Sequence, residues 1–257
     1  LLAMVSTACS DIRDIVGGGT QDLPSDGVVL TLKLPNFTKN TVATRAATEQ
    51  QINSLCVLCY DAGDNYLGMS TISSDSIKKD KGDDTYDVKV KAVPGTATLH
   101  IVANTTITKS DAKDAEGKNN LYNATREGNL KLTAPVCWGS VKVDSLLSGS
   151  PKVWLFRQFA KASVTKDTKV KNFEITGFKL FNTAKKGTIA TKSLDKVALS
   201  SVAYTHEENY SMGEHPFYET PAAGKAYMII KAKYDGGPDT YYKVEFFNNG
   251  TSTPMAL

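Results

Sequence analysis

The chain has 257 residues, 41% of them apolar, and a formal net charge of +3, so it is long enough for one large or two ordinary domains. Acidic and basic residues are interspersed without a basic block, which argues against a nucleic-acid partner. Three histidines are few for a metalloprotein or an acid–base enzyme. Gly, Asn and Asp clusters recur about every ten residues among abundant Tyr, Thr, Val and Lys, a rhythm typical of many short strands.

The N-terminus resembles the end of a bacterial lipoprotein signal peptide. An apolar, small-residue run from Leu1 to Ala8 precedes Cys9, where such a signal carries its acylated cysteine. The alternatives are the tail of an ordinary secretory signal and a short buried strand. The polar, Gly-rich stretch that follows up to Asp26 has the composition of a flexible tether, so we expect residues 1–26 to be a signal remnant and tether.

Two predicted strands flank one basic peptide bond. The first, Val28–Leu34, alternates between apolar and polar residues like a half-buried strand, and Ile52–Tyr60 is almost continuously apolar like a strand buried on both faces. The apolar face of the first strand consists of Val28, Leu30, Leu32 and Leu34. Between the strands, the Arg45–Ala46 bond lies in a Thr-, Ala- and Asn-rich linker that a trypsin-like protease can reach. A cut there would separate a whole strand from its sheet, which points to assembly.

Three cysteines lie in the predicted core segments. Cys56 and Cys59 have the CxxC spacing that a redox or zinc site would also have. Residues three apart on a strand point to opposite faces, however, so the two thiols diverge. With no second CxxC and no neighbouring histidine, we interpret both residues, and Cys137, as small buried hydrophobes.

Further alternating or apolar segments predict strands along the rest of the chain. They are Tyr66–Met69, Tyr86–Ala92, Ala97–Asn104, Val153–Val164, Phe173–Phe181, Ala226–Tyr234 and Tyr241–Phe247. A short helix is expected around Ser110–Glu116, and no helix exceeds about three turns. These patterns predict an all-β protein. Because Ser148–Pro151 is the best linker candidate, we expect two sandwich domains, residues 27–149 and 150–257.

One polar cluster raises the possibility of an enzyme. It consists of His206, Glu207, Glu208, Glu214 and His215. The two histidines are nine residues apart without HExxH spacing, and catalysis requires titratable groups that converge. A solvated loop is the favoured interpretation, so we expect no catalytic residue, no metal site and no cofactor.

The order and spacing of several segments carry a family resemblance. They are Thr44–Ala46 followed by Ile52–Asp61, Val93–Gly95 with Leu99–Asn104, Leu155–Lys161, Phe173–Asn182, Pro216–Glu219 and Tyr241–Val244. Over most of its length the chain thereby resembles the fimbrillin family, the type V pilins of Bacteroidetes. Cys56 and Cys59 stand where that family more usually has larger apolar or aromatic residues.

The resemblance implies a fold and a mechanism. The fold is two tandem transthyretin-like β-sandwich domains, and the precursor is an exported outer-membrane lipoprotein anchored through Cys9. An Arg-specific protease is then expected to cut between Arg45 and Ala46 and to remove the lipidated segment together with the strand Val28–Leu34. A strand of a neighbouring subunit fills the vacated groove, and repetition builds an adhesive cell-surface fimbria. The expected partners are therefore other pilin subunits, the maturation protease and a surface ligand.

Two points of the resemblance leave alternatives open. Family members usually end with further strands after an Arg-Asn motif, and these supply the donor strand, whereas the sequence here stops at Leu257. We expect either a longer natural chain or a subunit at one end of the filament. The alternative function is a monomeric surface lipoprotein that keeps its first strand and binds a glycan or a host protein.

Overall fold

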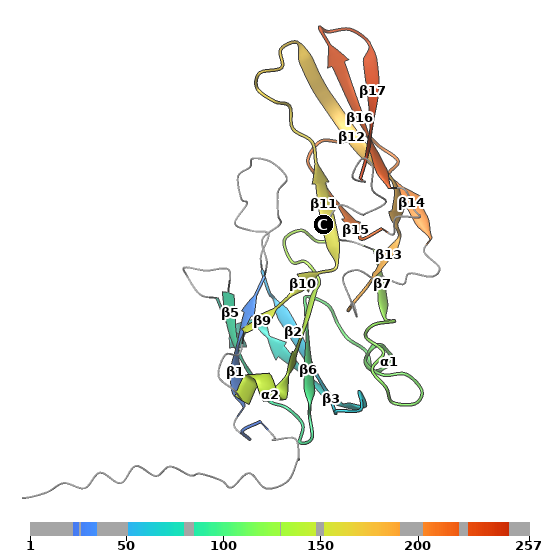
Figure 1. Ribbon diagram of the computed structural model, residues 1–257. Helices are drawn as coiled ribbons and strands as arrows, with labels where there is room; N and C mark the ends of the chain where they lie inside the picture. Colours follow the sequence, from blue (N-terminus) through green and yellow to red (C-terminus); the bar gives the residue numbers. More distant parts are fainter. Residues whose placement is uncertain are drawn as a thin grey trace, which may run out of the picture.

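The computed structural model describes residues 23–25, 27–34, 51–79, 85–128, 130–147, 152–190, 203–220 and 226–246 (Figure 1). Strands dominate this part of the chain, and its helical elements are short: α1 (Lys109–Ala112), α2 (Val143–Leu147) and the 3₁₀ turn η2 (Ser74–Ser76). The expected all-β class is confirmed, and the short helix predicted near Ser110 is present as α1.

The strands in the described part of the chain form three larger sheets and one small one. The first sheet has the order β4 (Ile77–Lys79), β5 (Thr85–Val90), β1 (Val28–Lys33), β9 (Lys152–Trp154). The second sheet has the order β10 (Phe156–Arg157), β8 (Cys137–Lys142), β6 (Thr98–Ala103), β2 (Ser54–Tyr60), β3 (Tyr66–Ser73). The third sheet has the order β11 (Phe159–Ser163), β15 (Glu214–Tyr218), β12 (Phe173–Ala184), β16 (Tyr227–Tyr234), β17 (Asp239–Glu245), with β14 (Tyr204–His206) also paired to β12. The small sheet pairs β13 (Lys186–Thr188) with β7 (Thr125–Glu127).

The first and second sheets pack face to face around one apolar core. Because side chains alternate along each strand, every second residue enters this core. Its fully buried members include Leu30, Leu32, Leu55, Val57, Val88, Leu99, Ile101 and Leu155. These two sheets therefore form a β-sandwich in the N-terminal half of the chain.

The second sheet is buried on its other face as well. Cys56, Leu58 and Tyr60 of β2 belong to a separate apolar cluster, which residues around α1 and Ile189 complete. The continuous apolar run in the sequence predicted this double burial, and the prediction is confirmed.

The third sheet rises beyond the sandwich, and the ends of β12, β16 and β17 reach farthest from it (Figure 1). Its own apolar cluster is smaller and contains Ala160, Ala162, Phe178, Leu180 and Phe217. Among the described residues, the C-terminal half contributes this one large sheet. The second transthyretin-like sandwich therefore stays a prediction.

One strand prediction was wrong. The segment Val153–Val164 was expected to be a single strand, but it is divided among three sheets as β9, β10 and β11. The breaks fall at Leu155 and Gln158, and Leu155 is itself buried in the sandwich core. A periodic apolar pattern reports which residues are buried, but it does not report which neighbour each one packs against.

The first part of this segment, β9 and β10, pairs with strands of the N-terminal half. β9 pairs with β1 and β10 pairs with β8, although both strands follow the expected boundary at residues 149 and 150. The division into two domains stays a prediction, and the strand pairing favours a boundary near Gln158.

Candidate functional site

Strand β1 lies in the middle of the first sheet. It pairs antiparallel with β5, from Val28 opposite Val90 to Lys33 opposite Thr85. On its other side it pairs in parallel with β9, where Leu32 lies opposite Val153. The N–H of Leu155 also donates to the Lys33 carbonyl at 2.9 Å. Both backbone edges of this strand are therefore hydrogen-bonded to neighbours.

The two faces of β1 differ as the sequence predicted. Leu30 and Leu32 are 0% exposed, Leu34 is 1% exposed, and half-buried Val28 packs against the same core. On the outer face, the Thr31 hydroxyl donates to Asp87 at 2.8 Å, and Lys33 Nζ lies 5.2 Å from the centre of the Trp154 ring. The residues expected to form the displaced strand are thus the inward-facing residues of a central strand.

The other residues predicted for maturation lie outside the described part of the chain. Cys9, the expected lipidation site, and the Arg45–Ala46 bond both fall there. Their roles stay predictions.

The cysteines are packed as expected. Cys59 belongs to the sandwich core, whereas Cys56 lies in the cluster on the opposite face of the second sheet. Burial raises the pKa of the Cys56 thiol to about 11 and that of Cys137 to about 12. Both thiols are therefore protonated at neutral pH, which disfavours metal binding and thiol exchange.

Sequence reasoning missed a buried histidine in the second sheet. His100 is 1% exposed, and the Trp138 indole N–H donates to its Nδ1 at 3.0 Å. Rings of Tyr60, Tyr122 and Trp138 surround it at centroid distances of 5.1 to 5.8 Å. Burial lowers the pKa of His100 to about 4, although Asp64 acts in the opposite direction. The imidazole is neutral near pH 7 and has a packing role.

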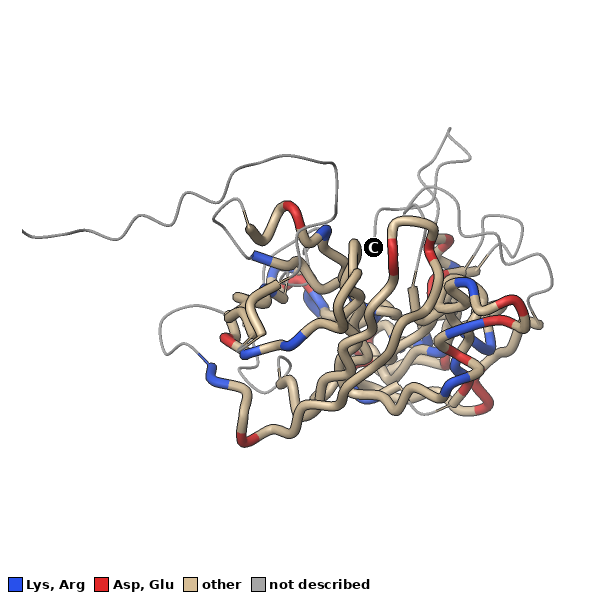
Figure 2. The backbone as a smooth tube through the Cα atoms, turned by 90° about the horizontal axis from the view of Figure 1, so that it is seen from below, with Lys and Arg blue, Asp and Glu red and all other residues tan. Residues whose placement is uncertain are grey.

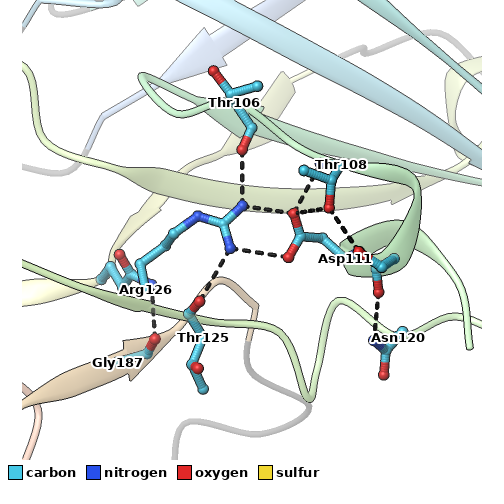
Figure 3. Close-up of polar contacts among 9 residues, drawn as sticks. Thr106, Thr108, Asp111, Asn120, Thr125, Arg126 and Gly187 are labelled. Atoms are coloured by element: carbon cyan, nitrogen blue, oxygen red, sulfur yellow. Dashed lines mark hydrogen bonds and ion pairs between the residues drawn. The ribbon is translucent and has the colours of Figure 1, made fainter.

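A second feature that the sequence did not reveal is the bidentate pair of Arg126 and Asp111 (Figure 3). Arg126 Nη1 and Nη2 donate to the two carboxylate oxygens of Asp111 at 2.9 and 2.8 Å. Nη2 also donates to the Thr106 carbonyl at 2.8 Å, and Thr108 caps α1 with Asp111 in a capping box. Arg126 lies on β7, which pairs with β13. The ion pair thereby fastens the α1 region to the strand that connects to the C-terminal half.

Hydrogen bonds to main-chain groups on and beside β13 also connect the two halves. Gln158 Nε2 donates to the carbonyl oxygens of Gly187 and Thr188 at 3.1 and 2.7 Å. The N–H of Ile189 donates to the Ala124 carbonyl at 2.9 Å, and its side chain is buried in the cluster behind the second sheet. The two halves therefore share both hydrogen bonds and apolar core.

The polar cluster around the two C-terminal histidines divides in space, with His206 apart from the contacting pair of His215 and Glu207. His206 is exposed and stacks on Phe181 at a centroid distance of 6.0 Å. His215 is 7% exposed and lies beside Glu207, with its Nδ1 2.8 Å from Glu207 Oε2. In the described residues, no group of three or more His, Cys, Asp or Glu side chains is placed to hold a metal ion.

Charged residues of both signs alternate along the described chain. Figure 2 shows Lys and Arg positions interspersed with Asp and Glu positions along the backbone, without a broad field of one sign. No helix in the described part of the chain is long and apolar enough to cross a membrane.

Known proteins resemble this chain both in sequence profile and in structure. A sequence profile described as "Fimbrillin-A associated anchor proteins Mfa1 and Mfa2" matches residues 22–133. A fimbrial assembly protein from Parabacteroides distasonis has a similar structure, with 16% identity, a TM-score of 0.57 and 85% of each chain covered. A candidate cell adhesion protein from the same species has 12% identity and a TM-score of 0.53, over 86% of this chain and 80% of its own. A search of curated proteins returns no match.

The similar structures establish the fold class, and the sequence profile bears on the family resemblance. The chain has the all-β fold of Bacteroidetes fimbrial proteins, since at these identities the structural likeness establishes the fold. The resemblance to the fimbrillin family is confirmed by the profile match, whose residues 22–133 include β1 and its neighbour β5 in the N-terminal sandwich. These similar proteins are described as fimbrial and cell adhesion proteins.

Proposed function

We propose that the chain is a structural subunit of an adhesive cell-surface fimbria, exported as an outer-membrane lipoprotein acylated at Cys9. Two transthyretin-like sandwich domains form the subunit. Proteolysis between Arg45 and Ala46 removes the lipidated segment with β1, and a strand of a neighbouring subunit takes its place. The family resemblance and the position of β1 support this proposal.

The observation that carries the proposal is the double pairing of β1. A strand with neighbours on both sides leaves two rows of unpaired N–H and C=O groups when it is removed, together with an apolar trough. An added strand satisfies the backbone through main-chain hydrogen bonds and fills the trough with alternate side chains. Because such a head-to-tail contact does not close on itself, it propagates into a filament.

The free energy gained by burying the leucines of β1 favours replacement of this strand over an empty groove. Each buried leucine contributes about 1.5–3 kcal/mol, so Leu30, Leu32 and Leu34 together contribute about 5–9 kcal/mol. That is comparable with the whole stability of an ordinary domain, about 5–15 kcal/mol. A subunit without β1 therefore has a strong drive to bind an equivalent strand.

The test is limited digestion of the purified chain with an Arg-specific protease. We expect a cut after Arg45, identified by mass spectrometry, and no cut there in an Arg45→Gln variant. A fluorescent peptide with the sequence of residues 28–34 then reports the groove. It should bind the cut chain after the N-terminal fragment is removed, whereas a peptide with aspartate in place of Leu30 and Leu32 should not.

Filament formation is followed in the same samples by light scattering and electron microscopy. The cut chain, mixed with subunits that carry a donor strand, should assemble, whereas the Arg45→Gln variant should not. If the cut chain stays monomeric and takes up no strand peptide, strand exchange is wrong for this chain and the monomeric surface lipoprotein is the better account.

A further inference from the structure

Three polar side chains converge on the third sheet, away from β1. His215 lies on β15, Glu207 directly follows β14, and Ser211 lies in the connection between those strands. His215 Nδ1 is 2.8 Å from Glu207 Oε2, and His215 Nε2 is 3.1 Å from Ser211 Oγ. A hydroxyl, an imidazole and a carboxylate joined in this order form the arrangement that activates a serine nucleophile.

The neighbouring hydrogen bonds fix the direction of proton donation. Glu207 Oε2 also accepts the backbone N–H of Leu180 at 2.8 Å, so this carboxylate oxygen acts as an acceptor. His215 is therefore placed to donate from Nδ1 to Glu207, and the tautomer that does so carries its lone pair on Nε2. That lone pair faces Ser211 Oγ and is placed to accept the hydroxyl proton.

Each member of the cluster contacts β12, through its backbone or through the Phe178 ring. Glu207 is bound to Leu180 through its own N–H, which donates to the Leu180 carbonyl at 3.0 Å. Ser211 exchanges two hydrogen bonds with Phe178, at 2.9 and 3.2 Å. The His215 ring stacks on Phe178 at a centroid distance of 4.0 Å. Positions fixed in this way give the preorganisation that a catalytic group needs.

Strand β12, which the cluster contacts, has a bulge and a glycine at this point. The pairing register of β12 shifts between Ile175 and Gly177, and such bulges are frequent beside active sites. A Cβ atom added at Gly177 would lie 3.0 Å from the Ser211 nitrogen, so glycine allows the two backbones to approach closely.

An open cavity lies beside Met212, the residue that follows the exposed Ser211. Its volume is about 390 Å³, within the range of small-molecule sites. Its apolar wall is formed by Val164, Phe173, Ile175 and Met212, and Met212 directly follows Ser211. The side chain of His215 is only 8% exposed, whereas Ser211 is exposed and accessible from solvent. Met212 is the point at which this cavity meets the segment that carries Ser211.

We propose that Ser211 is a nucleophile that accepts the acyl group of small carboxylic esters. Ser211 Oγ bonds to the ester carbonyl carbon while His215 Nε2 takes the hydroxyl proton. The ester C–O bond then breaks, and His215 returns the proton to the departing alkoxide. Water attacks the acyl-serine in the same way, releases the carboxylic acid and restores Ser211. The balance is one ester and one water to one acid and one alcohol.

The first experiment uses a fluorophosphonate probe, which forms a stable adduct with activated serines. The intact chain should gain one adduct, located at Ser211 by peptide mass spectrometry. The Ser211→Ala variant should gain none, and Glu207→Gln should react more slowly because its neutral amide does not support the imidazolium that forms. Ser163→Ala, at an exposed serine on neighbouring β11, is the matched control and should react like the original chain.

Hydrolysis of p-nitrophenyl butyrate is measured in parallel. Ser211→Ala should lower kcat/KM by about 100-fold, the scale of a lost acid–base and nucleophilic contribution. Circular dichroism checks that each variant is folded. An adduct at Ser211 supports the proposal whether turnover is fast or slow. Absence of an adduct, or the same adduct yield in Ser211→Ala, shows that the cluster serves only to fasten β14 and β15 to β12.

Discussion

At the residue scale, the exposure of each side chain follows from the strand that carries it. On β1, buried Leu30 and Leu32 alternate with Val29, which is 50% exposed, and with Thr31 and Lys33, which are half-buried. This period of two was readable in the sequence because it needs no information about neighbours. The pairing of Arg126 with Asp111 was not readable, because the two residues meet only after the chain folds back from α1 to β7.

A pH-dependent contribution to stability follows from that ion pair. Hydrogen bonds from Arg126, helped by Thr108 and opposed by burial, hold the pKa of the Asp111 carboxyl well below its usual range. Because the folded-state pKa lies below the unfolded one, the ionised carboxylate stabilises the fold at neutral pH. This contribution is lost as the pH falls below about 4.

The test replaces the carboxylate. Asp111→Asn should lower the free energy of unfolding at pH 7 by about 1–3 kcal/mol, as expected for hydrogen bonds to a charged group. The loss should shrink at pH 3, measured by urea denaturation at both pH values. Asp75→Asn, at an exposed carboxylate, is the control and should change little at either pH. An equal loss for Asp111→Asn at both pH values would contradict this account.

At the element scale, the route of residues 152–163 organises the molecule. β9 completes the first sheet, β10 the second and β11 begins the third, so one short segment ties all three together. The crossing is close, because a Cβ added at Gly139 on β8 would lie 2.3 Å from the Trp154 carbonyl oxygen. The glycine is therefore required by packing against another strand, which nothing in its own local sequence indicates.

Gly139→Ala tests this crossing. The added methyl group must displace a backbone carbonyl, so we expect a loss of unfolding free energy of about 1–3 kcal/mol, the usual cost of overpacking. Ser140→Ala, at the exposed neighbour on the same strand, should stay within about 0.5 kcal/mol of the original chain. Chemical denaturation measures both, and equal midpoints for the two variants would show that β8 and β9 separate without cost.

At the scale of the whole molecule, the two halves are joined by more than a linker. β7 and β13 pair across the junction, and Ile189 of the C-terminal half is 3% exposed in a cluster with Leu58 and Val102 of the second sheet. Shared core of this kind couples the unfolding of one half to that of the other. We therefore expect the protein to unfold in a single thermal transition.

Ile189→Ala should weaken this coupling. Truncating a buried isoleucine costs about 2–5 kcal/mol, and here the loss falls on the contact between halves. Differential scanning calorimetry should show a lower Tm and a transition that broadens or divides. Lys186→Ala, on β13 just before Ile189 but outside this cluster, should leave one sharp transition. A single unchanged transition in Ile189→Ala would mean that the halves are held together elsewhere.

The sequence by itself determined the all-β class, the two faces of β1, the double burial of β2 and the divergence of Cys56 and Cys59, because each depends on a period of two along one strand. Only the tertiary structure decided that β1 has neighbours on both sides, that Val153–Val164 divides among three sheets, and that Ser211, Glu207 and His215 converge. Those outcomes depend on which distant segments meet, and local periodicity carries no record of that choice.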